Sequence, residues 1–251
     1  SLEDCENQLK SEYKEYFSKQ RPFRANEILF HILRNGKKPT ISIYNYLLYR
    51  SYTIKGNINN IEAEGILDKI FDKTNPVELN TYTLNIIIKG LSLKYKTQPI
   101  EFDNELLKYF YEFDKHGVQM DVSTHNSILE SLLEMGRYEE GWKEYTNMQN
   151  ESEPEYFTIE LILKAIINQL QKEADKTWIN RGFDIYKKYN SDYQRFFTAE
   201  FYESLLKASL IIDQNNEKRN NYFTNVSLSF IEKNYNNENL SFSEGFLNEL
   251  L

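Results

Sequence analysis

The sequence has little cysteine, histidine, glycine or proline, and each shortage excludes a class of structure. A single cysteine, Cys5, leaves no partner for an internal disulfide and too few ligands for a cysteine-based zinc site. The three histidines are scattered over different predicted helices, so we expect no metal centre and no cofactor. Nine Gly and five Pro are too few for a β-sandwich or barrel, which needs turn residues at about every 8–12 positions. No apolar run reaches the roughly 18 residues of a membrane span.

Catalytic motifs are missing as well. The sequence has no G-x-S-x-G, P-loop or H-E-x-x-H string, and its acidic residues are spread along the chain. His31, His116 and His125 have no fixed Cys or Asp companion, and His125 is more simply explained as a packing residue. We therefore expect that this chain is not an enzyme.

Charge is distributed unevenly along the chain. Lys and Arg number 30 against 38 Asp and Glu, a net charge of −8. The first 100 residues carry 15 basic against 11 acidic residues, a net charge of +4, while the remaining residues carry 15 against 27, a net charge of −12. The N-terminal part can therefore face an anionic polymer, whereas the acidic C-terminal part is better suited to a basic protein partner or to solubility.

The sequence does contain an internal repeat. Four segments begin with small or β-branched residues, have Asn or Glu in fifth place and then turn apolar: 41–48 (ISIYNYLL), 81–88 (TYTLNIII), 122–129 (VSTHNSIL) and 156–163 (YFTIELIL). Their fifth residues are Asn45, Asn85, Asn126 and Glu160, at spacings of 40, 41 and 34 residues, and a weaker copy holds Glu203. Periods in this range are typical of repeat architectures.

Each repeat is expected to form two helices. Apolar residues recur at intervals of three and four, the period that places them on one helix face. The clearest copy has a first helix with Ile128, Leu129, Leu132 and Leu133 on one side. Gly136 ends that helix, and a second one follows over residues 138–148 with Trp142, Tyr145 and Met148 along one side. Such a hairpin is too small to bury its apolar face without a stacked neighbour.

The same pattern predicts helices over residues 2–17, 23–33, 156–171, 175–189, 198–212, 217–235 and 241–251. The expected fold class is all-α, an α-solenoid of stacked antiparallel helical hairpins. About six hairpins and a terminal helix would form one continuous domain over residues 1–251. The Asn-rich stretches 57–60 and 234–239 are expected to be turns.

Residues 122–148 (VSTHNSILESLLEMGRYEEGWKEYTNM) resemble a pentatricopeptide repeat. That family's usual pattern is an opening V-T-Y-N-T-L-I helix, a K-x-G-R turn and a second helix that ends in an acidic-x-M run. Residues 25–39 (ANEILFHILRNGKKP) are similar to the second helix and closing G-x-x-P of such a repeat, and residues 41–48 to the next opening. Because several units are longer than the family's repeat, the chain looks like a degenerate fungal or protist member.

The resemblance implies sequence-selective binding of single-stranded RNA, with one base read per repeat. It also implies a place in the mitochondrial matrix, with a transit peptide outside these 251 residues, and a role in RNA stability, processing or translation. In the family, the fifth residue and the last residue of a unit read the base. Carried over to this sequence, the pairs are Asn45 with Asn80, Asn85 with Asp121, and Asn126 with Glu155. These pairs imply a pyrimidine-rich or U-rich target.

Other residues are candidates for stacking and for phosphate contacts. The second position of each unit, which lies against the base in the family, holds Ser42, Tyr82, Ser123 and Phe157. Stacking on Tyr82 would contribute roughly 1–3 kcal/mol. Basic residues on or just after the first helices are candidates for phosphate contacts: Arg50, Lys55, Lys89, Lys94 and Lys96.

Two alternatives to RNA binding remain open. The acidic balance favours a scaffold that holds a basic protein partner. The chain can also be the substrate-binding region of an RNA-processing enzyme, such as an organellar ribonuclease P, whose catalytic part lies elsewhere. The asparagines have a structural explanation too, because Asn is favoured in the first turn of helices, where it satisfies backbone donors.

Overall fold

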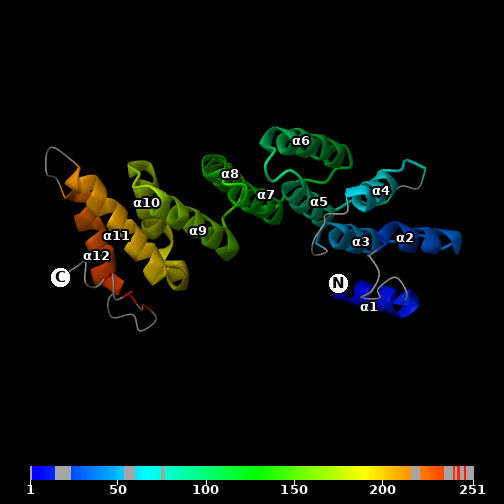
Figure 1. Cartoon of the computed structure of the whole chain (residues 1–251), viewed down its shortest axis with the longest axis horizontal. Helices are drawn as coiled ribbons and strands as arrows, with labels where there is room; N and C mark the ends of the chain where they lie inside the picture. Colours follow the sequence, from blue (N-terminus) through cyan, green and yellow to red (C-terminus); the bar gives the residue numbers. More distant parts are fainter. Residues whose placement is uncertain are drawn as a thin grey trace. The chain divides into compact units, whose positions relative to one another are not determined.

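We describe a computed structural model, in which residues 2–14, 24–53, 60–74, 77–215, 221–234, 240, 242–243 and 246 are placed. All regular structure in this part of the chain is helical (Figure 1). The chain divides into two compact units, residues 1–137 and 138–251, and we describe each by itself.

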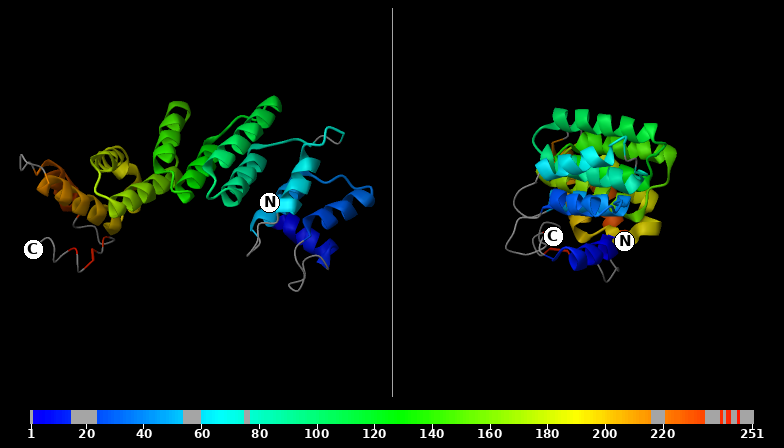
Figure 2. Two further views of the ribbon diagram at one scale, coloured as in Figure 1. Left: turned by 45° about the horizontal axis from the view of Figure 1, so that its top comes forward. Right: turned by 90° about the vertical axis from the view of Figure 1, so that its right-hand side faces the viewer.

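The first unit contains seven α-helices among its described residues: α1 (Leu2–Glu12), α2 (Ala25–Arg34), α3 (Ile41–Thr53), α4 (Asn60–Ile70), α5 (Thr81–Lys94), α6 (Pro99–Lys115) and α7 (Val122–Glu134). Helix α3 packs against α1, α4 and α5, and α5 packs in turn against α6 and α7. Helices α5 to α7 are seen side by side in Figure 2. The odd-numbered helices thus form one row, and α2 packs against α4 in a second.

The ends of these helices follow from local sequence. Gly36 and Gly136 have φ angles of 70° and 75°, a left-handed conformation that glycine adopts without steric cost. The amide of Gly136 donates to the Leu133 carbonyl at 3.0 Å, and the amide of Arg137 donates to the Leu132 carbonyl at 2.9 Å. This pattern satisfies the last carbonyls of α7, and it confirms the breaks predicted at both glycines.

The core of the first unit lies between the helices and consists of aliphatic and aromatic side chains. Tyr44, Leu47 and Ile87 are fully buried. The row predicted on the first helix of the clearest repeat is confirmed for Ile128, Leu129 and Leu132, which are buried, while Leu133 is half-buried. Since the apolar side chains of α3 and α5 are covered by neighbouring helices, each hairpin depends on the next one for its burial.

The second unit has five described α-helices and a short 3₁₀ turn: α8 (Tyr138–Glu151), α9 (Tyr156–Lys172), α10 (Lys176–Tyr193), η2 (Gln194–Phe196), α11 (Ala199–Gln214) and α12 (Tyr222–Asn234). Helix α9 packs against α8, α10 and α11, and α11 packs against α10 and α12. No helix in the described ranges of either unit is both long and apolar enough to cross a bilayer.

The predicted helical segments agree with α2 and with α8 to α11 within a few residues at each end. Two bounds were wrong, because α1 ends at Glu12 and α12 begins only at Tyr222. The predicted helix over residues 241–251 and most of the Asn-rich stretches 57–60 and 234–239 lie outside the described residues; Asn60 opens α4 and Asn234 closes α12. The all-α class is confirmed for the described part, and a continuous single-domain solenoid stays a prediction.

Candidate nucleic-acid interface

Helices α3, α5 and α7 present equivalent positions on one side. The second, fifth and ninth residues of a helix share a face, because residues three, four and seven apart lie close in angle around the helix axis. We call the residues at these positions the first-helix face: Ser42, Asn45 and Tyr49 in α3, Tyr82, Asn85 and Lys89 in α5, and Ser123, Asn126 and Glu130 in α7.

Contacts between the helices align this face from one repeat to the next. The Asn85 amide nitrogen donates to the Ser123 hydroxyl at 2.8 Å, which joins the fifth position of α5 to the second position of α7. Between α3 and α5, partial burial and the nearby Tyr49 raise the pKa of Tyr82. The Tyr82 phenol therefore stays neutral, and it lies close to an aromatic residue of the preceding repeat.

The three predicted base-reading asparagines differ in exposure. Asn45 is 2% exposed and Asn126 is 5% exposed, whereas Asn85 is half-buried. A base cannot reach a side chain that is covered to this extent unless its neighbours move. The three amides are therefore not equally presented to solvent, and base reading by Asn45, Asn85 and Asn126 stays a prediction. The physical reason for this difference is that Asn45 and Asn126 lie on the packed side of their helices, among buried neighbours such as Tyr44 and His125 in the sequence.

Asn85 keeps one unused hydrogen-bonding atom. Among the described side chains, its amide oxygen and that of Asn45 are buried and accept no hydrogen bond. A buried acceptor without a partner costs about 1–3 kcal/mol, so a ligand donor at this place would be favourable. The residue that Asn85 contacts through its amide nitrogen, Ser123, is exposed at the surface.

The predicted second base readers Asn80 and Asp121 are helix N-caps. The Asn80 side-chain oxygen accepts from the Thr83 amide at 2.9 Å, and one Asp121 oxygen accepts from the Thr124 amide at 2.8 Å. Capping explains why Asn or Asp stands just before a first helix. Burial acts to raise the pKa of Asp121, but hydrogen bonds from Thr124 outweigh it and hold the pKa below its usual value.

Glu155, the third of these residues, stands at the N-cap of α9 in the second unit and makes no side-chain capping bond. In the same helix, Glu160 at the fifth position forms an ion pair with Lys164 at 2.6 Å. Base reading by Asn80, Asp121 and Glu155 stays a prediction.

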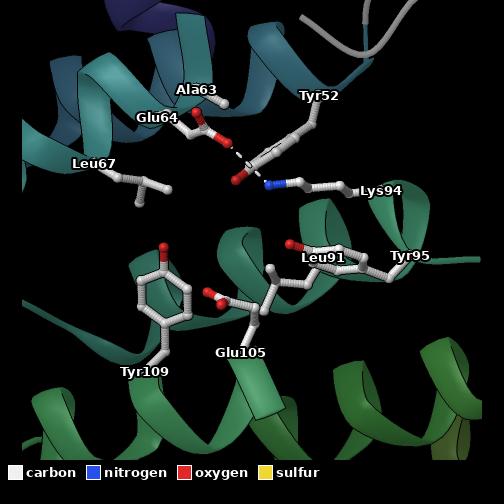
Figure 3. Close-up of a pocket in the computed structure, with 9 residues that line it drawn as sticks. All are labelled: Tyr52, Ala63, Glu64, Leu67, Leu91, Lys94, Tyr95, Glu105 and Tyr109. Carbon is white, nitrogen blue, oxygen red and sulfur yellow. Dashed lines mark hydrogen bonds and ion pairs between the residues drawn. The ribbon is translucent and has the colours of Figure 1, made fainter. Parts of the chain in front are cut away.

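The predicted phosphate contacts do not form a basic strip. The Lys89 ammonium lies 2.7 Å from a Glu134 oxygen and 3.3 Å from a Glu130 oxygen, both on α7. The Lys94 ammonium lies 2.9 Å from a Glu64 oxygen in a cavity lined by α3 to α6 (Figure 3). Carboxylates thus already neutralise both lysines in this structure, and phosphate contacts by Lys89 and Lys94 stay a prediction.

The remaining basic candidates are scattered. Arg50 is half-buried, Lys96 is exposed beyond the end of α5, and Lys55 lies outside the described residues. The first-helix face therefore offers little positive charge to a phosphate backbone.

Exposed aromatic rings are the groups on the first-helix face that are best suited to bind a ligand. Tyr49 is 43% exposed and Tyr82 is 44% exposed. A half-exposed tyrosine has part of its side chain packed against the protein and part of its ring in solvent. A nucleotide base needs such an exposed ring face for stacking. Tyr82 was predicted from its place in the repeat. Tyr49 was missed, although it stands four residues after Asn45, where a helix brings side chains together.

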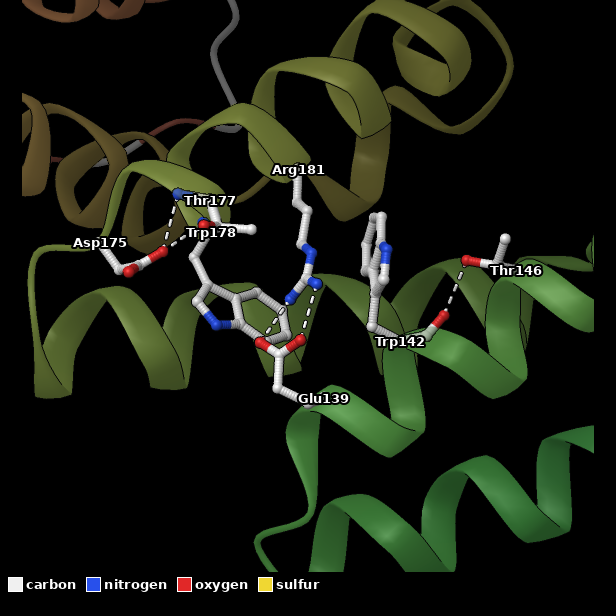
Figure 4. A network of polar contacts seen from close by, with 7 residues as sticks. All are labelled: Glu139, Trp142, Thr146, Asp175, Thr177, Trp178 and Arg181. Carbon is white, nitrogen blue, oxygen red and sulfur yellow. Dashed lines mark hydrogen bonds and ion pairs between the residues drawn. The ribbon is translucent and has the colours of Figure 1, made fainter.

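The second unit holds an aromatic clamp around an internal cation (Figure 4). The Arg181 guanidinium lies 4.8 Å from the Trp142 ring centroid and 4.3 Å from that of Trp178. Both of its terminal nitrogens donate to Glu139 at 2.8 Å. This cluster ties α8 to α10. Arg181 occupies the space between the two tryptophan rings, so the cluster serves to hold the helices together and leaves no room for a ligand cation there.

The described residues contain few other groups that could form a catalytic or metal site. His125 is 4% exposed, which confirms its prediction as a packing residue. Within the described ranges no three His, Cys, Asp or Glu side chains gather as a metal site would need. Comparison with models of known protein families gave no match, and comparison with curated protein sequences gave none either.

Proposed function

We propose that this chain is a pentatricopeptide-like helical-repeat protein that binds single-stranded RNA along the first-helix face. The observation that carries the proposal is the Asn85–Ser123 hydrogen bond, because it supports the alignment of the fifth position of one repeat with the second position of the next. A strand laid across α3, α5 and α7 would then meet equivalent groups at each step.

Stacking supplies most of the affinity in this proposal. Bases insert beside Tyr49 and Tyr82, each contact contributing about 1–3 kcal/mol. Asn85 adds selectivity, since its amide oxygen has no acceptor role in the folded chain and its amide nitrogen donates only to the exposed Ser123 hydroxyl, which a base could replace. An amide that both donates and accepts suits the Watson–Crick edge of a pyrimidine. A function in mitochondrial RNA stability, processing or translation is proposed on the repeat resemblance alone.

The test is a fluorescence anisotropy titration of the full chain with labelled oligo-U, oligo-A and mixed RNA. Binding should prefer oligo-U, and Tyr82→Ala should weaken it by about tenfold, as expected from the loss of one stacked base. Asn85→Ala should reduce the preference for U more than the affinity for oligo-A. The matched control is Tyr111→Ala, which removes a 63% exposed tyrosine from α6 in the same unit.

Salt dependence provides a second readout in the same experiment. Because Lys89 and Lys94 are paired with carboxylates, few phosphates would be neutralised. The affinity should therefore change little between about 50 and about 200 mM salt. Negligible binding of all three RNAs, or equal losses in the Tyr82 and Tyr111 variants, would refute the proposal.

A further inference from the structure

The first unit contains a cavity of about 260 Å³ that the proposed RNA face does not use. Four helices line it: Tyr52 comes from α3, Glu64 from α4, Lys94 from α5, and Glu105 and Tyr109 from α6. Tyr95, which follows the last residue of α5, completes the wall (Figure 3). The cavity therefore lies where two successive hairpins meet.

Its walls combine aromatic rings with carboxylates. Burial raises the pKa of Tyr52 well above its usual value and raises that of Tyr109 to about 12, so both phenols are neutral near neutral pH. Electron-rich ring faces attract cations, and the attraction grows where water is excluded. With the carboxylates of Glu64 and Glu105 on opposite sides (Figure 3), the cavity has the composition of a cation-binding cage.

The chain's own Lys94 shows that an ammonium is stable here. Its nitrogen lies 2.9 Å from a Glu64 oxygen and 5.0 Å from the centroid of the Tyr95 ring. Burial acts to lower the pKa of Lys94, but the contacts with Glu64 and Tyr95 outweigh it and raise the pKa. Lys94 pairs with Glu64 on one side of the cavity. Glu105, across the cavity, is paired with Lys108, whose side chain is 68% exposed.

A shallower groove continues from this cavity along α6. It shares Tyr95 and Glu105 with the cavity, and adds Glu101, Leu107 and Lys108. Leu107 is 64% exposed and gives the groove an apolar surface. Across cavity and groove, three carboxylates face two ammonium groups, so the surface keeps an excess of negative charge.

We propose that this cavity binds the basic side chain of an extended segment of a partner protein. The lysine or arginine head enters between Tyr52, Tyr95 and Tyr109 and pairs with Glu105. A neighbouring apolar residue of the partner packs on Leu107 in the groove. Charge complementarity selects this occupant over RNA, because the carboxylates repel a phosphate backbone.

The test uses two small probes of nearly equal shape, N-acetyl-arginine methylamide with its charged guanidinium and N-acetyl-citrulline methylamide with a neutral urea group in its place. Each is titrated into isotope-labelled full-length chain and followed by NMR chemical shifts. The arginine probe should shift resonances of residues 63–67 and 91–95 and saturate, while the citrulline probe should not. Glu105→Gln should weaken arginine binding by about tenfold, the usual effect of losing a charged hydrogen-bond partner.

Two further variants make the result decisive. Glu112→Gln makes the same change on α6 outside the cavity and should leave binding unaltered. Lys94→Met removes the internal competitor for Glu64 and should strengthen binding. Equal shifts with both probes, no saturable shifts, or equal effects of Glu105→Gln and Glu112→Gln would overturn the proposal. RNA titrations with Glu105→Gln distinguish it from the RNA proposal, because this variant should bind RNA as the parent does.

Discussion

At the scale of single residues, asparagine and aspartate recur in this chain in two different structural settings. Just before a first helix, Asn80 and Asp121 accept hydrogen bonds from backbone amides that would otherwise have no partner. At the fifth position, Asn45 and Asn126 are buried. Of the three fifth-position asparagines, Asn85 is the least buried.

If Asp121 acts as the N-cap of α7, two substitutions at this position should differ in their effect on stability. Asp121→Ala should destabilise the chain by about 0.5–2 kcal/mol, because the Thr124 amide loses its acceptor. Asp121→Asn should cost much less, since the amide oxygen can still accept. Urea denaturation measures both. An equal loss of stability in the two variants would contradict the capping account.

The hydrogen bond between Asp121 and the Thr124 amide also makes the stability of the chain depend on pH. The folded state holds the pKa of Asp121 below its usual value. The charged cap therefore contributes stability above the unfolded-state pKa, and this contribution is lost as the pH falls through the folded-state pKa. The stability of Asp121→Asn should lack this part of the acid dependence.

At the scale of elements, helix pairs are held together by contacts of two kinds. In the first unit, helices approach closely: a Cβ atom at Gly90 of α5 would overlap the Tyr52 ring of α3. In the second unit, the Arg181 clamp with Glu139, Trp142 and Trp178 connects α8 with α10. Both contacts join residues distant in sequence, and both set how one helix lies on the next.

The clamp predicts a stability change with a clear control. Arg181→Ala should destabilise the chain by about 1–3 kcal/mol, because it removes two charged hydrogen bonds and two ring contacts. Arg181→Lys should recover only part of this, since an ammonium cannot bind a carboxylate through two parallel hydrogen bonds. Lys187→Ala, an exposed change on the same helix, should have little effect. Thermal or urea unfolding monitored by circular dichroism measures the differences.

At acidic pH, the difference in unfolding free energy between Arg181→Ala and the parent chain should become smaller. Hydrogen bonds from Arg181 hold the pKa of Glu139 below its usual value of 4.5, against the effect of burial. The ion pair therefore contributes stability above that pH, and its contribution is lost as the pH falls through the folded-state pKa. A stability difference that stays constant into strong acid would contradict the ion-pair account.

The sequence predicted the helices better than it predicted their side-chain contacts. Periodic apolar residues and the glycines at positions 36 and 136 were sufficient for α2, α7 and α8, because these signals are local. The pairing of Lys94 with Glu64 and the close approach at Gly90 were not predictable in this way. They depend on which helices become neighbours, and a repeat pattern does not specify that at the level of single atoms.

At the scale of the whole molecule, the first unit offers two surfaces of different charge, both of which carry tyrosine rings. The first-helix face offers Tyr49 and Tyr82 with little free positive charge, and the cavity at α3 to α6 offers carboxylates and rings. This division fits a protein that stacks on bases with one surface and holds a basic protein segment with another. A net charge of −8 weakens nonspecific attraction to RNA, so selectivity would depend on contacts with the bases.

The most direct measurement is photochemical cross-linking of the full chain to an RNA oligomer that contains 4-thiouridine, followed by mass spectrometry of the adducts. Our account predicts adducts on α3 and α5, at or beside Tyr49 and Tyr82, and their loss in a Tyr49→Ala, Tyr82→Ala double variant that remains folded. Adducts confined to the second unit, or an unchanged pattern in the double variant, would contradict it.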